Sequence, residues 1–162
     1  MAVTAVAFDV GETLVDEATT YDRWEAEGET TLVFEDRDLH ADALGCLAAL
    51  RARGLRLGAA GNMYAHHESY LRPHVDFVGS SERWGVEKPD SGFFAHVVDE
   101  SGVPAEEIIY VGDRVDNDVV PALAAGLHAV RVRRGEHARV ESAEGTVTID
   151  SLDELLEALE RV

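Results

Sequence analysis

The sequence predicts an α/β fold in which a parallel sheet of about five strands lies between two layers of helices. Short apolar runs, typical of buried strands, recur along the chain. Between them lie segments whose apolar residues have helical spacing. Strands that alternate with helices imply a parallel sheet with right-handed crossovers. The chain has 162 residues, 46% of them hydrophobic, with no internal repeat or linker, so we expect a single domain over residues 1–162.

The apolar runs place the strands at residues 3–8, 55–60, 75–78, 108–111 and 127–132, with 147–149 as a candidate sixth strand. Helical spacing predicts helices at residues 41–53, 63–72, 91–99 and 119–125. Ser91 is the expected N-cap of the third helix. Ser151 and Glu154 form a capping box that opens a final amphipathic helix. Residues 133–146 have the most loop-like composition.

Residues 16–40 interrupt this alternation. The segment is polar and acidic, and its Thr-Thr-Leu-Val-Phe run at residues 30–34 predicts a short β segment. It is too short for a second domain, so we expect a flap-like insert.

The composition limits the classes of partner. A formal net charge of −18 argues against nucleic acid and anionic membranes, since both require a basic patch. The longest mostly apolar stretch, residues 119–130, is too short to span a bilayer and contains a proline. The N-terminus has no basic region typical of a signal peptide. Cys46 is the only cysteine, which fits a reducing compartment, so we expect a cytoplasmic protein.

The basic residues are almost all arginine. Both adaptation to high salt and a GC-rich coding bias would produce an acidic, lysine-poor chain, and the composition does not separate them. Lys88 is the only lysine, which indicates that its position requires a compact ammonium rather than a planar guanidinium.

Carboxylates follow two of the predicted strands. Asp9 ends the first strand, and Asp113 follows the strand at 108–111, with Asp116 and Asp118 shortly after it. Ligands of open α/β sheets bind at the carboxyl ends of the strands. Because clustered carboxylates repel one another without a cation, this arrangement indicates a metal site.

Three motifs occur in order along the chain: D-x-G-x-T at residues 9–13, K-P-D at 88–90 and G-D-x-x-x-x-D at 112–118. Together they resemble the haloacid dehalogenase (HAD) superfamily of aspartyl-nucleophile phosphohydrolases. The resemblance extends from about residue 3 to residue 132 and implies a three-layer Rossmann-like core. In that family a cap domain is inserted where this chain has residues 16–40, so the resemblance implies a vestigial cap and an open site, unless a homodimer covers it.

The resemblance also implies roles for individual residues. Asp9 would be the nucleophile that forms an aspartyl-phosphate, and Lys88 would pair with it and with the phosphate. Thr13 would order the loop. The implied Mg²⁺ ligands are Asp9, Asp113, the backbone carbonyl of Gly11 and, directly or through water, Asp118.

The chain departs from the family pattern in two places. The Ser or Thr that binds phosphate after the second strand is missing, and Gly61 and Asn62 stand there as the candidate phosphate-binding residues. Gly11 replaces the Asp that serves the family's phosphatases as acid and base, and Glu12 is the candidate substitute. The dehalogenase branch is disfavoured because it needs an aromatic residue at position 11. His66 and His67 are expected on the surface, with no zinc site.

Two hypotheses follow. The first is a Mg²⁺-dependent phosphohydrolase that acts on a phosphate monoester through Asp9. The alternative is a catalytically degenerate HAD-fold protein that binds metal or phosphate, or acts as an interaction module, and Gly11 and Gly61 favour it. A receiver-type phosphoacceptor domain is disfavoured because its aspartate ends the third strand. The sequence does not indicate the substrate.

Overall fold

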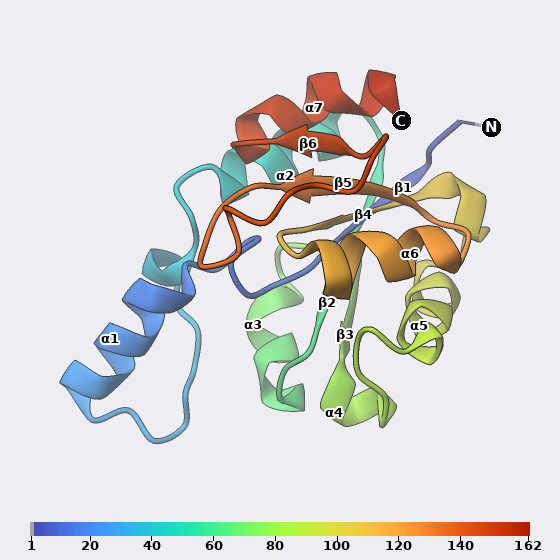
Figure 1. The fold of residues 1–162 in the computed structure, drawn as a ribbon. Helices are drawn as coiled ribbons and strands as arrows, with labels where there is room; N and C mark the ends of the chain where they lie inside the picture. The colour runs from blue at the N-terminus through green and yellow to red at the C-terminus, as the bar shows by residue number, and fades with distance from the viewer. Residues whose placement is uncertain (1) are drawn as a thin grey trace.

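The computed structural model describes residues 2–162, which fold around a six-stranded parallel sheet of order β3-β2-β1-β4-β5-β6 (Figure 1). The strands are β1 (Ala5–Phe8), β2 (Arg56–Gly61), β3 (Phe77–Ser80), β4 (Ile108–Gly112), β5 (His128–Val132) and β6 (Val147–Ile149). The predicted strands are confirmed, and the candidate sixth strand pairs with β5. The strand order reverses between β1 and β4, and this is where ligands bind in such sheets.

Helices cover both faces of the sheet (Figure 1). The helices are α1 (Glu17–Glu27), α2 (Ala43–Ala52), α3 (Glu68–Leu71), α4 (Ser81–Trp84), α5 (Ser91–Ser101), α6 (Val120–Ala124) and α7 (Leu155–Ala158). Successive side chains of β1 point to opposite faces of the sheet, as in any pleated strand. Val6 and Phe8 pack with α2 and α7, whereas Ala5 and Ala7 pack with α5 and α6. One hydrophobic core thus lies on each face of the sheet, and the helices, the sheet and the helices beyond it form three layers.

Local capping chemistry fixes several helix ends. The carboxylate of Asp90 accepts a hydrogen bond from the backbone N–H of Gly92 at 2.8 Å, so Asp90 rather than Ser91 is the N-cap of α5. The predicted capping box of Ser151 and Glu154 is present. A single π-helical turn, Val115–Val119, precedes α6.

The insert at residues 16–40 consists of α1, an extended return and a short 3₁₀ turn. The predicted β segment at residues 30–34 is wrong. Leu32 has a left-handed φ of 53°, which breaks an extended run. The carbonyl oxygen of Val33 accepts hydrogen bonds from the Trp24 indole and the Arg23 guanidinium, both at 2.9 Å, so α1 takes the place of a strand partner.

His67 contradicts the expectation of a surface position. The residue is 5% exposed, and its ring stacks on Phe34 with ring centroids 4.2 Å apart, which packs the insert against the core. Burial, and then the charge of His66, lower the pKa of His67 to about 4. His66 is exposed, as expected.

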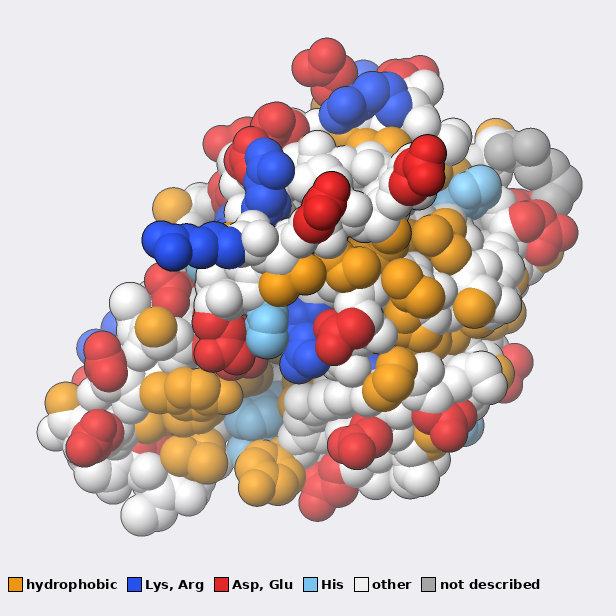
Figure 2. Space-filling model, in the orientation of Figure 1, with side chains coloured by type: hydrophobic (Ala, Val, Ile, Leu, Met, Phe, Trp, Pro, Cys, Tyr) orange, Lys and Arg blue, Asp and Glu red, His pale blue; other side chains and the backbone are white. Residues whose placement is uncertain are grey.

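Acidic side chains are scattered over the face shown in Figure 2. Hydrophobic side chains form a broad group across the centre of this face and a second group near α1, beside histidine. None of the helices in residues 2–162 has the length and apolar character needed to cross a membrane.

Arg134 fastens the loop after β1 to two distant segments. Its guanidinium donates to the carbonyl oxygen of Glu12 at 3.0 Å and to that of Thr13, and it pairs with Asp42 at 2.8 Å. The same Asp42 carboxylate accepts from the hydroxyl of Ser151 at 2.8 Å. Residues 133–146 contain no helix or strand, as predicted. Because no regular element positions Arg134, its own side-chain hydrogen bonds join this loop to the rest of the structure.

We predict that Arg134→Ala lowers the free energy of unfolding by about 2 kcal/mol, because charge-assisted hydrogen bonds to partly buried partners are lost. The matched control is Arg133→Ala, whose exposed pair with Asp150 should change stability much less. Urea denaturation of the two variants and the wild type measures this. Equal losses in both variants would contradict the role given to Arg134.

Candidate active site

Three aspartates meet at the carboxyl edge of the sheet. Asp9 follows β1, Asp113 follows β4, and Asp118 lies in the π turn before α6. One carboxylate oxygen from each lies within 4.8 Å of the others, and all three residues are buried. Asp116 stays outside the cluster, exposed and paired with Arg114 at 2.8 Å. The structure therefore gathers the three predicted acidic side chains at the point where the strand order reverses.

Lys88 lies inside this cluster. Its Nζ is 2.6 Å from Oδ1 of Asp9 and 2.6 Å from Oδ1 of Asp118, and its side chain is 2% exposed. The rings of Phe93 and Tyr110 lie 5.6 and 5.5 Å from the ammonium. Burial alone would lower the pKa of Lys88, but the charges of Asp118 and Asp9 outweigh it and hold the pKa well above its ordinary value. Lys88 is a fixed positive charge at this site.

Asn62 positions Lys88 through its backbone. The Asn62 side-chain oxygen accepts from the Lys88 N–H at 2.8 Å, and its amide nitrogen donates to the Lys88 carbonyl at 3.1 Å. The carboxamide is thus occupied by the protein itself. Gly61 runs beside the nucleophile candidate, because a Cβ added there would lie 3.2 Å from Oδ1 of Asp9. Phosphate binding by Gly61 and Asn62 stays a prediction that would rest on the backbone.

Thr13 bridges two of the carboxylates. Its buried hydroxyl lies 3.2 Å from Oδ2 of Asp9 and 3.4 Å from Oδ1 of Asp113. A hydroxyl has one proton and can donate it to only one of them at a time. The position fits the structural role expected for Thr13.

The charges of this cluster do not balance. Burial, and then the charges of Asp9 and Asp118, raise the pKa of Asp113 to about 9. Burial and Asp9 raise the pKa of Asp118 to about 6, although Lys88 opposes this shift. If all three carboxyl groups were ionised, one ammonium would stand against three negative charges; the raised pKa values reflect this excess, and a divalent cation would offset it. These hard oxygen donors fit Mg²⁺. The Gly11 carbonyl as a further ligand stays a prediction.

Glu12 is not among the side chains that surround Lys88. It has a left-handed φ of 62°, and its carboxylate accepts from the backbone N–H of Glu17 at 2.7 Å. The carboxylate of Glu17 lies next to Gly11 instead: a Cβ added to Gly11 would be only 1.8 Å from Oε1 of Glu17. Sequence reasoning missed Glu17, because no motif marks it and only the path of α1 brings it there.

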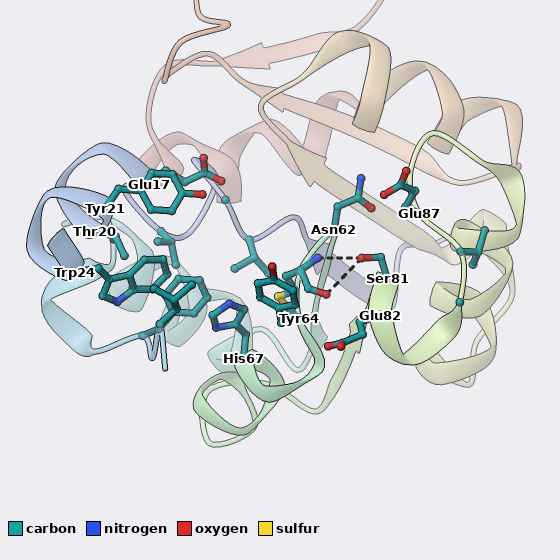
Figure 3. A pocket seen from close by; sticks show the side chains of 18 residues that line it. Glu17, Thr20, Tyr21, Trp24, Asn62, Tyr64, His67, Ser81, Glu82 and Glu87 are labelled. Carbon is teal, nitrogen blue, oxygen red and sulfur yellow. Dashed lines mark hydrogen bonds between the residues drawn. The ribbon is translucent and has the colours of Figure 1, made fainter. Parts of the chain in front are cut away.

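A cavity of about 750 Å³ lies between the insert and the core (Figure 3). The residues of the cluster do not line it, but Val10 and Gly11, which follow Asp9 directly, and Asn62, which binds the backbone of Lys88, do. Much of the remaining lining is aromatic and comes from Tyr21, Trp24, Phe34, Tyr64 and His67. The insert therefore builds one wall of a pocket beside the acidic cluster.

Comparisons with known proteins identify the proteins that the chain resembles. A family model described as HAD-hydrolase-like matches residues 86–155. The chain is 37% identical over 123 residues to a glyceraldehyde 3-phosphate phosphatase of Methanocaldococcus jannaschii, covering 72% of this chain and 54% of that protein. The protein of the same name from Methanopyrus kandleri is 37% identical over 108 residues, covering 63% of this chain and 46% of the relative. The chain thus spans about half the length of these curated relatives.

Solved structures share the fold at low sequence identity. A HAD phosphatase from Thermococcus onnurineus superposes with a TM-score of 0.77 at 19% identity, covering 99% of this chain and 100% of that one. The putative HAD-hydrolase YfnB from Bacillus subtilis, solved bound to magnesium, has a TM-score of 0.73 at 18% identity, covering 98% and 99%. These likenesses show the shared fold. The family model, the curated relatives and the three ordered motifs together show that the chain belongs to the haloacid dehalogenase superfamily.

Proposed function

We propose that this protein is a Mg²⁺-dependent phosphohydrolase that cleaves a phosphate monoester through an aspartyl-phosphate on Asp9. The observation that carries the proposal is the contact between Asp9 and Lys88 at 2.6 Å, inside a cluster with Asp113 and Asp118. A buried carboxylate held beside a fixed cation suits attack on a phosphoryl group. The two curated relatives are named phosphatases, which supports the same class of reaction.

The reaction divides between the residues of the cluster. Asp9 supplies the attacking oxygen, and its two oxygens are oriented by Lys88 and Thr13. Lys88 offsets negative charge on the phosphoryl group during transfer. Asp9, Asp113 and Asp118 would hold Mg²⁺, which when bound neutralises phosphoryl charge and helps to orient the substrate.

The pocket beside Gly11 is the proposed site of the leaving group. Its volume and aromatic lining favour an alcohol with apolar surface over a small polar one. The relatives are named for glyceraldehyde 3-phosphate, whose leaving alcohol is smaller and more polar than the one this pocket favours.

The alternative proposal is a catalytically degenerate protein that binds metal or phosphate. Two observations favour it: Gly11 has no side chain to transfer a proton, and the carboxamide of Asn62 is occupied by Lys88. Mg²⁺ binding without turnover of any phosphodonor would select this alternative.

We predict Mg²⁺-dependent phosphate release from acetyl phosphate and from an aryl phosphate. Asp9→Asn should lower the rate by at least about 10³-fold, because the nucleophile is lost while the fold is kept. The matched control is Asp116→Asn, an exposed aspartate near the cluster, which should keep wild-type activity. Undiminished release by Asp9→Asn, or release unaffected by a chelator, would contradict the proposal.

We also predict that Lys88→Arg lowers kcat/KM by about 10²–10³-fold, even though the charge is kept. The ammonium is packed between two carboxylates and two rings, and a guanidinium is larger and requires a planar fork of partners. Steady-state kinetics with the aryl phosphate measures the effect, and near-ultraviolet circular dichroism controls for folding. A folded variant with wild-type kcat/KM would show that any cation suffices at this position.

A further inference from the structure

The space beside Gly11 is filled by a side chain from elsewhere in the sequence. A Cβ built on Gly11 would lie 1.8 Å from Oε1 of Glu17 and 2.9 Å from its carboxyl carbon. The Glu17 carboxylate therefore stands where a side chain of residue 11 would begin. Gly11 follows Asp9 by two residues, so this place lies next to the nucleophile of the proposed reaction.

The start of α1 determines the position of Glu17. Asp16 caps the helix by accepting from the N–H of Thr19 at 3.2 Å. Glu12 accepts from the N–H of Glu17 itself at 2.7 Å. Glu17 then lines the pocket, where Figure 3 shows its carboxylate beside Tyr21. The side chain is half-buried and faces the space proposed for the leaving group.

A carboxyl group placed beside the reacting phosphoryl group can give a proton to the leaving oxygen and take one from water.

Two other carboxylates near the pocket are bound to the backbone, and a third, the exposed Glu87, lies across the pocket from Glu17 (Figure 3). Glu12 is bound to the backbone of Glu17, and Glu82 accepts from the N–H of Ala65 at 2.6 Å. Asp116 is paired with Arg114 outside the cluster. Glu17 therefore has the best position to exchange a proton with a substrate on Asp9.

We propose that Glu17 is a catalytic residue that protonates the leaving oxygen and then deprotonates the hydrolytic water, in place of the side chain that Gly11 lacks. This inference rests on the proposed phosphohydrolase function.

The proton and bond changes balance over two half-reactions. In the first, an Asp9 oxygen bonds to phosphorus, the bond from phosphorus to the ester oxygen breaks, and that oxygen takes the proton of Glu17 to leave as an alcohol. In the second, the Glu17 carboxylate takes a proton from water, the water oxygen bonds to phosphorus, and the bond from phosphorus to Asp9 breaks. Glu17 is protonated again, Asp9 is free, and inorganic phosphate leaves.

The test compares leaving groups in Glu17→Gln. With an alkyl phosphate, whose leaving oxygen needs a proton, kcat/KM should fall by about 10²–10⁴-fold. With 4-nitrophenyl phosphate, whose leaving group departs without a proton, kcat/KM should stay within about tenfold of wild type. Slow water attack should then appear as a burst of one equivalent of nitrophenolate before slow turnover. The matched control is Glu25→Gln, an exposed glutamate on the same helix α1, which should behave as wild type with both substrates.

A second variant relocates the acid. A Cβ on residue 11 needs the space of the Glu17 carboxylate, so Gly11→Asp is combined with Glu17→Ala, and we expect this double variant to recover at least about tenfold of the activity on the alkyl phosphate relative to Glu17→Ala. An equal loss with both leaving groups and no burst in Glu17→Gln would overturn the inference, as would a double variant that stays as slow as Glu17→Ala. Glu12→Gln is a further comparison. If Glu12→Gln, and not Glu17→Gln, lost activity on the alkyl phosphate while keeping it on 4-nitrophenyl phosphate, the acid would be Glu12 and the inference would be overturned.

The failure of this inference can be told from the failure of the proposed function. If Asp9→Asn loses activity and Glu17→Gln does not, the proposed function stands and only the role of Glu17 is wrong. A wild type that hydrolyses neither substrate overturns both.

Discussion

One buried ammonium among three buried carboxylates is the constraint on which the site depends. Lys88 contacts Asp9 and Asp118 directly, and Asp113 completes the cluster without contacting the lysine. Such a group of like charges is unfavourable unless further positive charge is supplied. The fold holds it together because Asp9 and Asp113 end adjacent strands, where the strand order reverses. The same electrostatic excess makes the place suited to a divalent cation.

The parts around this cluster keep it in register and shape its surroundings. Arg134 holds the loop after β1 from one side, and the carboxamide of Asn62 holds the backbone of Lys88 from the other. The insert packs on the core through Phe34 and His67, and it delivers Glu17 to the place beside Gly11. The short insert thus lines the pocket and also supplies the group that we propose for proton transfer.

The features predicted correctly are those that depend on local sequence patterns. Apolar runs and helical spacing reflect burial directly, so they predict the six strands and most of the helices. Asp9, Asp113 and Asp118 are predicted to meet because the carboxyl ends of parallel strands lie at one edge of the sheet. The failures have tertiary causes. Residues 30–34 have strand-like composition, but the side chains of α1 bind the carbonyl of Val33. His67 is buried by Phe34, and Glu17 reaches Gly11 only through the direction of α1. The stacking of His67 on Phe34 and the approach of Glu17 to Gly11 produce no pattern of spacing in the sequence.

The central claim is that Asp9 becomes covalently phosphorylated. The most direct measurement mixes the wild-type protein with acetyl phosphate and Mg²⁺, quenches in acid within the first turnover, and locates the phosphoryl group by peptide mass spectrometry. Our account predicts an acid-stable phosphoryl group on Asp9 and none in Asp9→Asn. Phosphate release with an unmodified Asp9, or a phosphoryl group on another residue, would contradict it.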